Sequence, residues 1–307
     1  MMSLKTAVIY NSCNNRWKSC TNFTCPSGTL QIEPPPHLED NTTTIIAGGM
    51  PVLHNQILFE HPLNERTRTL LRISHLFEQF EFHLAGSSQW QSRAALQALL
   101  DISSILARAD IKKDMLKQLE QQQKSLTSIS SNPKVDQVRL HQVLDDIAKM
   151  IDRLYSSGRQ LGGALRKNDF LKSISQRAPI PGGSYEFDLP QFHYWLNLPH
   201  TERVMQLDDW RHEISTVQET TELLLGLLRS GSVFQQQTAL KGLYQQNLDA
   251  KREVQLIQVK VDAASLLYAE ISGSKHRFAI RFLESNQGEH PGQSEQDVPF
   301  QLKTCAI

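Results

Sequence analysis

The sequence lacks net charge, long hydrophobic runs and a secretion signal. It carries 32 basic and 32 acidic side chains in 307 residues, so electrostatic recognition must come from local clusters of charge. No segment approaches the roughly 20 consecutive apolar residues that cross a bilayer, and the N-terminus has no apolar signal stretch. We therefore expect a cytoplasmic protein with no membrane partner.

The motifs of common enzymes are also missing. The chain has no phosphate-binding loop, no G-x-G-x-x-G, no H-E-x-x-H and no G-x-S-x-G. Its 11 histidines are scattered singly. His61 lies beside Glu60, but neighbours on an expected strand point to opposite faces and do not form an acid–base pair. We expect no enzyme activity and no cofactor.

Cysteine is scarce, and three of the four cysteines lie in the first 25 residues. Cys13, Cys20 and Cys25 are separated by six and then four residues, which is not the C-x2-C spacing of zinc sites. An unstructured segment is favoured over a metal site there, because the region is polar and contains three consecutive prolines. Cys305 is a lone thiol near the C-terminus.

The spacing of apolar residues along the chain divides it into three parts. Residues 1–52 show no sustained period, and we expect either disorder or a mispredicted N-terminal extension, with Met50 as an alternative start. Residues 53–230 predict a mainly helical domain, with short strands near 56–60 and 184–188 that are candidates to join the sheet. Residues 231–307 predict a β-domain. Helices followed by strands indicate an α+β fold with an antiparallel sheet built mostly from C-terminal strands.

Apolar residues at spacings of three and four predict the helices. The longest expected helix runs over 201–229, with Trp210, Ile214 and Leu224 on one seam. Such a seam either packs inside the fold or against a second copy of the chain, and the inside position is favoured. The other expected helices cover residues 64–84, 90–106, 111–126, 143–154 and 168–177.

After Gly231 the period changes from 3.6 to 2. We expect strands at 238–245, 254–261, 275–282 and 299–305, joined as an antiparallel meander that keeps one face wet.

The stretch SKHRFAIRFL (274–283) has an uneven distribution of charge between its two expected faces. As a strand it places His276, Phe278, Ile280 and Phe282 on one face and Lys275, Arg277 and Arg281 on the other. Arginine suits the recognition of carboxylates, because its planar fork makes paired hydrogen bonds. A merely solvated sheet face explains the same pattern. Nucleic-acid binding is a further alternative, but it favours aromatic side chains on the basic face, and the phenylalanines are expected on the other.

Several segments together resemble the ZapD family of bacterial cell-division proteins. The resemblance rests on EHPLNE (60–65), IPGGSYEFDLP (180–190), QTALKGLYQQN (237–247) and ISGSKHRFAIRF (271–282). It extends from about residue 53 to the C-terminus, whereas residues 1 to about 49 have no counterpart in the family pattern.

The resemblance implies a non-enzymatic homodimer with a helical and a β-domain. Such proteins bind the C-terminal tail of FtsZ and bundle its filaments, which promotes assembly of the Z-ring at midcell, and nucleic acid is not an expected partner. By motif match, the tail-binding residues are Arg277, Arg281, Arg108 in the stretch before the third helix, and Lys275.

Overall fold

The computed structural model describes residues 56–108, 110–132, 135–158, 160–249, 252–284 and 292–306, together with the backbone of 8–11 and 16–19. The chain forms two compact units, Met1–Val52 and Leu53–Ile307. In the first unit, β1 (Val8–Asn11) pairs antiparallel with β2 (Arg16–Ser19). Cys13, Cys20 and Cys25, and with them the predictions for this cysteine group, lie outside the described residues.

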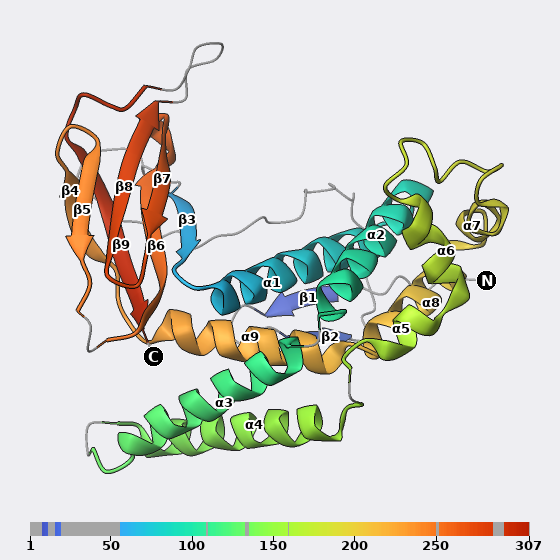
Figure 1. The fold of residues 1–307 in the computed structure, drawn as a ribbon, viewed down its shortest axis with the longest axis horizontal. Coiled ribbons are helices and arrows are strands. Elements are labelled where there is room, and N and C mark those ends of the chain that lie inside the picture. Colours follow the sequence, from blue (N-terminus) through green and yellow to red (C-terminus); the bar gives the residue numbers. More distant parts are fainter. Residues whose placement is uncertain are drawn as a thin grey trace, which may run out of the picture. The chain divides into compact units, whose positions relative to one another are not determined.

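The second unit begins with a strand, continues through helices and ends in strands (Figure 1). Its helices are α1 (Glu65–Leu84), α2 (Gln89–Leu106), α3 (Ile111–Ser128), α4 (Gln137–Ser156), α5 (Gly163–Lys167), α6 (Asp169–Arg177), α7 (Pro190–Leu196), α8 (His200–His212) and α9 (Ser215–Ser230). Its strands are β3 (Gln56–Pro62), β4 (Gln235–Ala239), β5 (Leu243–Asn247), β6 (Val254–Asp262), β7 (Leu267–Gly273), β8 (Arg277–Glu284) and β9 (Val298–Ala306). This confirms the predicted α+β fold class.

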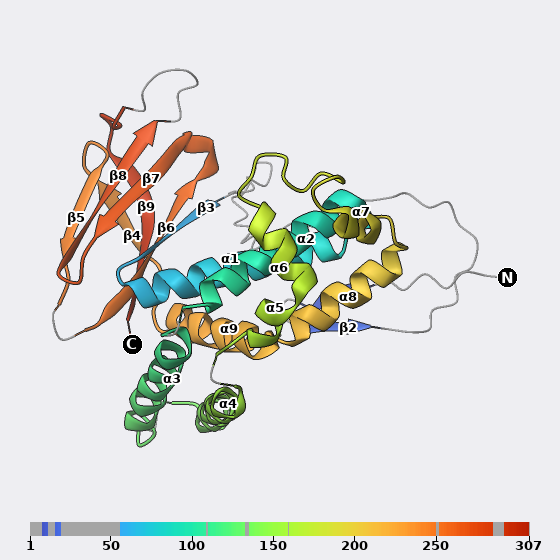
Figure 2. The same cartoon turned by 45° about the vertical axis from the view of Figure 1, so that its right-hand side comes forward.

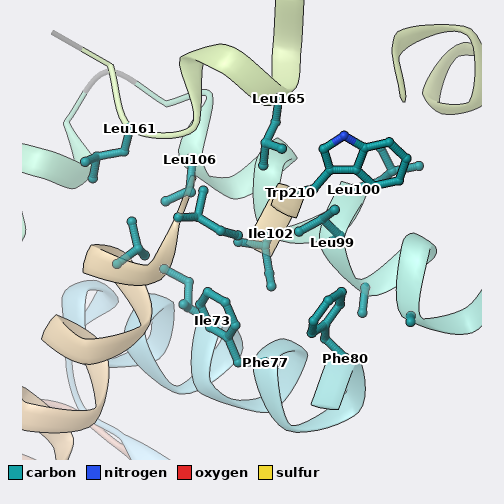
Figure 3. Close-up of a cluster of buried hydrophobic side chains, with 14 of the residues drawn as sticks. Ile73, Phe77, Phe80, Leu99, Leu100, Ile102, Leu106, Leu161, Leu165 and Trp210 are labelled. Carbon is teal, nitrogen blue, oxygen red and sulfur yellow. The ribbon is translucent and has the colours of Figure 1, made fainter. Parts of the chain in front are cut away.

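Side-chain caps define where the first helices begin. The Asn64 carboxamide accepts a hydrogen bond from the Thr67 amide at 2.8 Å, which satisfies one of the free donors at the start of α1. Ser88 and Gln91 form a reciprocal capping box at the start of α2. The apolar stripes then meet: Ile73 and Phe80 of α1 and Leu99 of α2 are all fully buried in one cluster (Figure 3).

The predicted helix over 201–229 is two helices. The α8 helix ends at His212 and α9 begins at Ser215, with the Ile214 amide donating to the carbonyl of Arg211 at 3.0 Å in the turn between them. The predicted inside position of the seam is confirmed, because Trp210, Ile214 and Leu224 are all buried within this chain. The turn lets α8 pack on α2 while α9 packs on α1 and α4.

The predicted strand at 184–188 is a series of turns. Gly182 adopts a φ of +73°, and the Tyr185 amide donates to its carbonyl at 3.0 Å. The Leu189 amide then donates to the Tyr185 carbonyl at 3.0 Å. These local hydrogen bonds occupy the backbone that a strand would offer to a neighbour, and Phe187 is 78% exposed.

The C-terminal strands form two antiparallel sheets rather than one meander (Figure 2). The four-stranded sheet has the order β3-β6-β9-β4, so the predicted early strand at 56–60 does join it, and the three-stranded sheet has the order β5-β8-β7. The predicted strand at 238–245 is split, because the chain turns at Lys241 and Gly242 and passes from one sheet to the other. Gly242 has a φ of +69°, and a Cβ there would lie 2.6 Å from the Ser294 carbonyl oxygen, so the turn requires glycine. Strand β7 was not expected from the sequence.

The two sheets pack face to face around a shared apolar core. Ile257, Val259 and Phe300 of the four-stranded sheet are buried in one cluster with Phe278 and Phe282 of the three-stranded sheet. The rings of Phe282 and Phe300 lie 5.0 Å apart between centroids. The β-part is therefore a small sandwich with two inner and two outer faces.

A polar network and an apolar contact join the sandwich to the helices. Arg229 of α9 donates to both carboxylate oxygens of Glu60 in β3, at 3.0 and 2.6 Å, and the Gln258 amide donates to the same carboxylate at 2.7 Å. Beside this network, Leu256 of β6 packs with Leu228 of α9. The outer face of the four-stranded sheet is therefore covered at this end.

Candidate partner-binding face

Strand β8 crosses the middle of the three-stranded sheet, and its side chains alternate as the sequence predicts. Phe278, Ile280 and Phe282 are 2%, 0% and 0% exposed and anchor the strand in the sandwich core. Arg277 and Arg281 are exposed on the opposite, outer face, with Ala279 half-buried between them. Arg277 and Arg281 are four positions apart along the strand, so their Cα atoms are separated by about 13 Å.

The first residues of the predicted strand form a turn instead. Lys275 and His276 lie between β7 and β8, and the Ser274 amide donates to the Arg277 carbonyl at 2.8 Å across the turn. His276 is exposed, so the prediction that it shares the inner face with Phe278 is wrong. The direction of Lys275 is likewise not set by strand alternation, because it lies in the turn two residues before Arg277.

The neighbouring strands supply different partners to the two arginines. Arg281 is in register with Glu270 of β7, and its Nη2 group forms an ion pair with the Glu270 carboxylate. Arg277 is in register with Asn247 of β5, a neutral residue, and makes no ion pair with any residue that the structure describes. Sequence reasoning missed Glu270, because its position opposite Arg281 becomes visible only once β7 is recognised as a strand.

A shallow hollow of about 600 Å³ lies next to Arg277, where the ends of β5, β7 and β8 meet. Its lining includes the amide side chains of Gln245 and Asn247, the small residues Ser272 and Ala279, and Arg277 itself. Polar amides, hydroxyls and one guanidinium around a floor of small side chains fit an extended, acidic segment of chain.

Arg108 lies apart from this face in the described structure. It follows the end of α2 in the helical part, and in the described ranges no hydrogen bond or ion pair joins it to β8. Nearby Lys112 has a structural role, since its ammonium group donates to the carbonyl oxygens of Ser157 and Gly158 at 2.8 and 3.2 Å. The structure thus places Arg277 and Arg281 on one face, with Lys275 in the turn before β8, and Arg108 in the helical part.

His61 and Cys305 have shifted pKa values, and in both cases burial in the fold is the largest cause. Burial lowers the pKa of His61, and the cation of Arg68 adds to the effect. Burial raises the pKa of the Cys305 thiol, which contacts Ser232 and Gln258 at 3.8 Å, so the thiolate nucleophile is disfavoured. Within the described ranges no group of three or more His, Cys, Asp or Glu side chains is arranged to hold a metal ion.

The aromatic side chains of β8 bear on nucleic acid as a partner. Phe278 and Phe282 point into the sandwich core, so they are not available to stack nucleic-acid bases on the basic face. Among the helices that the structure describes, none is long and apolar enough to cross a membrane.

Together, the helical part, the β-sandwich and the exposed arginine row define an α+β protein with a surface suited to an acidic partner. Comparison with known proteins then identifies the family. A sequence model of the ZapD family, described as cell division protein, matches residues 71–281, and the chain belongs to this family.

Curated relatives support the same assignment over nearly their whole length. The chain is 40% identical to the cell division protein ZapD of Methylococcus capsulatus over 255 residues, which are 83% of this chain and all of the relative. It is 36% identical to the proteins of the same name from Ralstonia pickettii and Klebsiella pneumoniae, over 81% and 82% of this chain and 99% and 100% of the relatives. A role in cell division follows from this membership.

Proposed function

We propose that this protein binds the C-terminal tail of FtsZ with the outer face of its three-stranded sheet and, as a homodimer, bundles FtsZ filaments at the midcell Z-ring in the cytoplasm. The observation that carries the proposal is the exposure of Arg277 and Arg281 on one face beside a hollow. Membership of the ZapD family adds support, because it gives the protein a role in cell division.

The chemistry of the face suits a flexible segment with carboxylates and apolar side chains. Each guanidinium presents a planar fork of donors that pairs with a carboxylate. Leu243 lies on β5 in register with Arg281 of β8. It is 37% exposed and offers an apolar contact beside the guanidinium. Because the guanidinium groups of Arg277 and Arg281 are exposed to water in the free protein, a single tail contact is expected to be weak and to exchange rapidly.

Bundling then depends on having two such faces. A dimer that engages two filament-borne tails converts the second binding event into an intramolecular one, which raises the apparent affinity by about 10²–10⁴-fold. Weak single sites are therefore compatible with stable filament bundles.

A surface at the opposite end of the helical part suits the dimer contact. Trp90, Tyr185, Phe187 and Tyr194, here called the aromatic surface, are 75%, 58%, 78% and 68% exposed. Arg93 connects Trp90 to the turns that carry Tyr185 and Phe187. Its guanidinium lies 5.6 Å from the centre of the Trp90 ring and donates a hydrogen bond to the Ser184 hydroxyl.

The size and charge of the aromatic surface fit a second copy of the chain. A fully buried aromatic side chain removes about 150–250 Å² from water, so four that are 58–78% exposed supply about 400–700 Å² of the roughly 800 Å² per partner of a specific interface. Charges of both signs surround them, with Glu186 and Asp188 near Arg177 and His193. Such a surface is able to pair with itself about a two-fold axis.

The experiment that tests the proposed function is sedimentation of FtsZ filaments with this protein, using full-length FtsZ and FtsZ without its C-terminal tail. We expect bundling and co-sedimentation with full-length FtsZ and neither with the tailless form. Equal bundling of both forms would rule out the tail as the partner. For the dimer, Phe187→Asp is expected to shift the sedimentation coefficient to that of a monomer, and an unchanged dimer would place the contact elsewhere.

A further inference from the structure

The two arginines of the outer face differ in the free protein. Arg281 is paired with Glu270, and the side chains of the two residues remain 56% and 49% exposed. Arg277 faces the neutral Asn247 and the hollow, without an ion pair in the described ranges. One member of the row is therefore open to an incoming carboxylate, while the other already holds one.

The contact between Arg281 and Glu270 leaves room for an exchange of partners. It joins one terminal nitrogen of the guanidinium, Nη2, to one carboxylate oxygen, Oε2. A guanidinium has five N–H donors, and a carboxylate that approaches in its plane takes two of them in parallel. A ligand carboxylate that makes two parallel hydrogen bonds to Arg281 is therefore expected to bind it more strongly than Glu270 does with one. Breaking the Arg281–Glu270 pair costs little, since exposed ion pairs contribute little to stability.

Backbone pairing keeps Glu270 at this place. It lies on β7 directly across from Arg281, in a ladder that continues on both sides through Ala269–Phe282 and Ile271–Ile280. The buried side chains of Phe282 and Ile280 hold that register. Glu270 can therefore rotate away from the guanidinium but stays on the same face of the sheet.

From this geometry we propose that Glu270 is a built-in competitor that holds Arg281 until an acidic ligand displaces it. The inference rests on the proposed function, because the ligand is the acidic tail that this face binds. Arg277 accepts the first carboxylate, and the second reaches Arg281 by replacing Glu270. Glu270 thereby lowers the affinity of each single tail and favours ligands that engage both arginines.

The test uses the full chain and a fluorescent peptide of the FtsZ C-terminal tail, with affinity measured by fluorescence anisotropy. Glu270→Gln keeps the shape of the side chain and removes its charge. We expect it to bind the peptide about two- to five-fold more tightly than the wild type. Glu284→Gln is the matched control, because Glu284 ends the same strand β8, is exposed, and makes no ion pair in the described ranges. We expect it to change the affinity by less than about 1.5-fold, since alternation places Glu284 on the opposite side of the strand from Arg281 and an exposed charge about 10 Å away is largely screened.

A second pair of variants shows whether the effect passes through Arg281. In the Arg281→Ala background, Glu270→Gln is expected to change peptide affinity by less than about 1.5-fold, because the competitor then has no partner to block. Unchanged or weaker binding by Glu270→Gln in the wild-type background would overturn the inference, and weaker binding would mean that Glu270 orients Arg281 instead. Equal gains in Glu270→Gln and Glu284→Gln would also overturn it. No peptide binding by the wild type would overturn the proposed function and this inference together, so the two failures are distinguishable.

Discussion

The two sheets of the sandwich share one core but have different outer faces. On the four-stranded sheet, outward residues such as Leu256 and Gln258 are 0% and 3% exposed because α9 covers them. On the three-stranded sheet, the outward residues Arg277 and Arg281 face solvent. One outer face attaches the sandwich to the helices, and the other is exposed to solvent.

The sequence of each central strand reflects this difference. Strand β6, VQLIQVKVD, is buried at most positions on both faces, whereas β8, RFAIRFLE, alternates between buried and exposed positions. Strands of an antiparallel sheet with one solvent-exposed face alternate between apolar and polar residues, whereas strands covered on both faces do not. The regularity of β8 therefore indicates an uncovered face.

The largest expected effect tests whether an outward position can belong to the core. Leu256→Ala is expected to lower the free energy of unfolding by about 2–5 kcal/mol, because it opens a cavity between the sheet and α9. Leu243→Ala on the open face removes the same atoms from a side chain that is 37% exposed, and less than about 1 kcal/mol is expected. Urea unfolding of both variants measures the difference. Similar losses would contradict the contrast between the faces.

The next effect concerns binding by the two faces. Reversing both charges with Arg277→Glu and Arg281→Glu is expected to weaken FtsZ tail binding by about 100-fold, because two charge-assisted contacts become repulsive. Lys260→Glu with Lys303→Glu makes the same change of charge on the outer side of the four-stranded sheet, where both ammonium groups lie about 5 Å from the Phe234 ring. There we expect a change of less than about three-fold from long-range charge alone.

Anisotropy with the tail peptide measures both double variants, and circular dichroism checks that each is folded. Wild-type binding should also weaken as salt rises from 0.05 to 0.3 M, since exposed charges are screened within about 10 Å at 0.1 M. Equal losses in the two double variants would show that net charge, and not the arginine face, governs binding.

A smaller effect is expected at the joint between the sandwich and the helices. Glu60→Gln retains one acceptor for Arg229 but removes the charge that accepts both of its hydrogen bonds. The pair is partly exposed, with 20% exposure for Glu60 and 36% for Arg229, so its loss should lie between that of surface and buried pairs, at about 1–2 kcal/mol. Thermal unfolding measures it, and Glu284→Gln serves as the control. A loss equal to that of the control would show that the joint depends on apolar contacts alone.

The smallest expected effect is a pH dependence at β3. The pKa of His61 is lowered in the folded protein by burial and by Arg68, so the unfolded chain binds more protons as the pH falls through about 6.5. Stability should therefore decrease between pH 7.5 and pH 5.5, and part of that decrease should disappear in His61→Gln. Urea midpoints at the two pH values test this. Identical pH dependence in both proteins would remove His61 as a contributor.

The predictable parts of the fold are those decided by local periodicity. The stripes of α1 and α2 and the alternation of β8 appear in the structure because each element has one covered and one open side. The break at Ile214 was not predictable, since the apolar seam continues through it without interruption. The division into two sheets was missed for a similar reason, because the pattern of TALKGLYQ predicts one continuous strand, whereas positive φ angles at Lys241 and Gly242 redirect the chain.

The candidate site was predictable to the same degree. Alternation alone places Arg277 and Arg281 outward, and the structure agrees. Glu270 was missed because its contact with Arg281 depends on the register between two strands, which is set by packing and not by spacing along one strand. Arg108 came from family resemblance, and its role in tail binding stays a prediction.

The chain enters and leaves the four-stranded sheet at its two edges. Strand β3 leads directly into α1, and α9 leads into β4, while the sheet order β3-β6-β9-β4 places both strands on the outside. A body held at two separate points resists twisting in a way that a single tether does not. Force applied to the open face is thus divided between two covalent connections, which limits rotation of the sandwich relative to the helices.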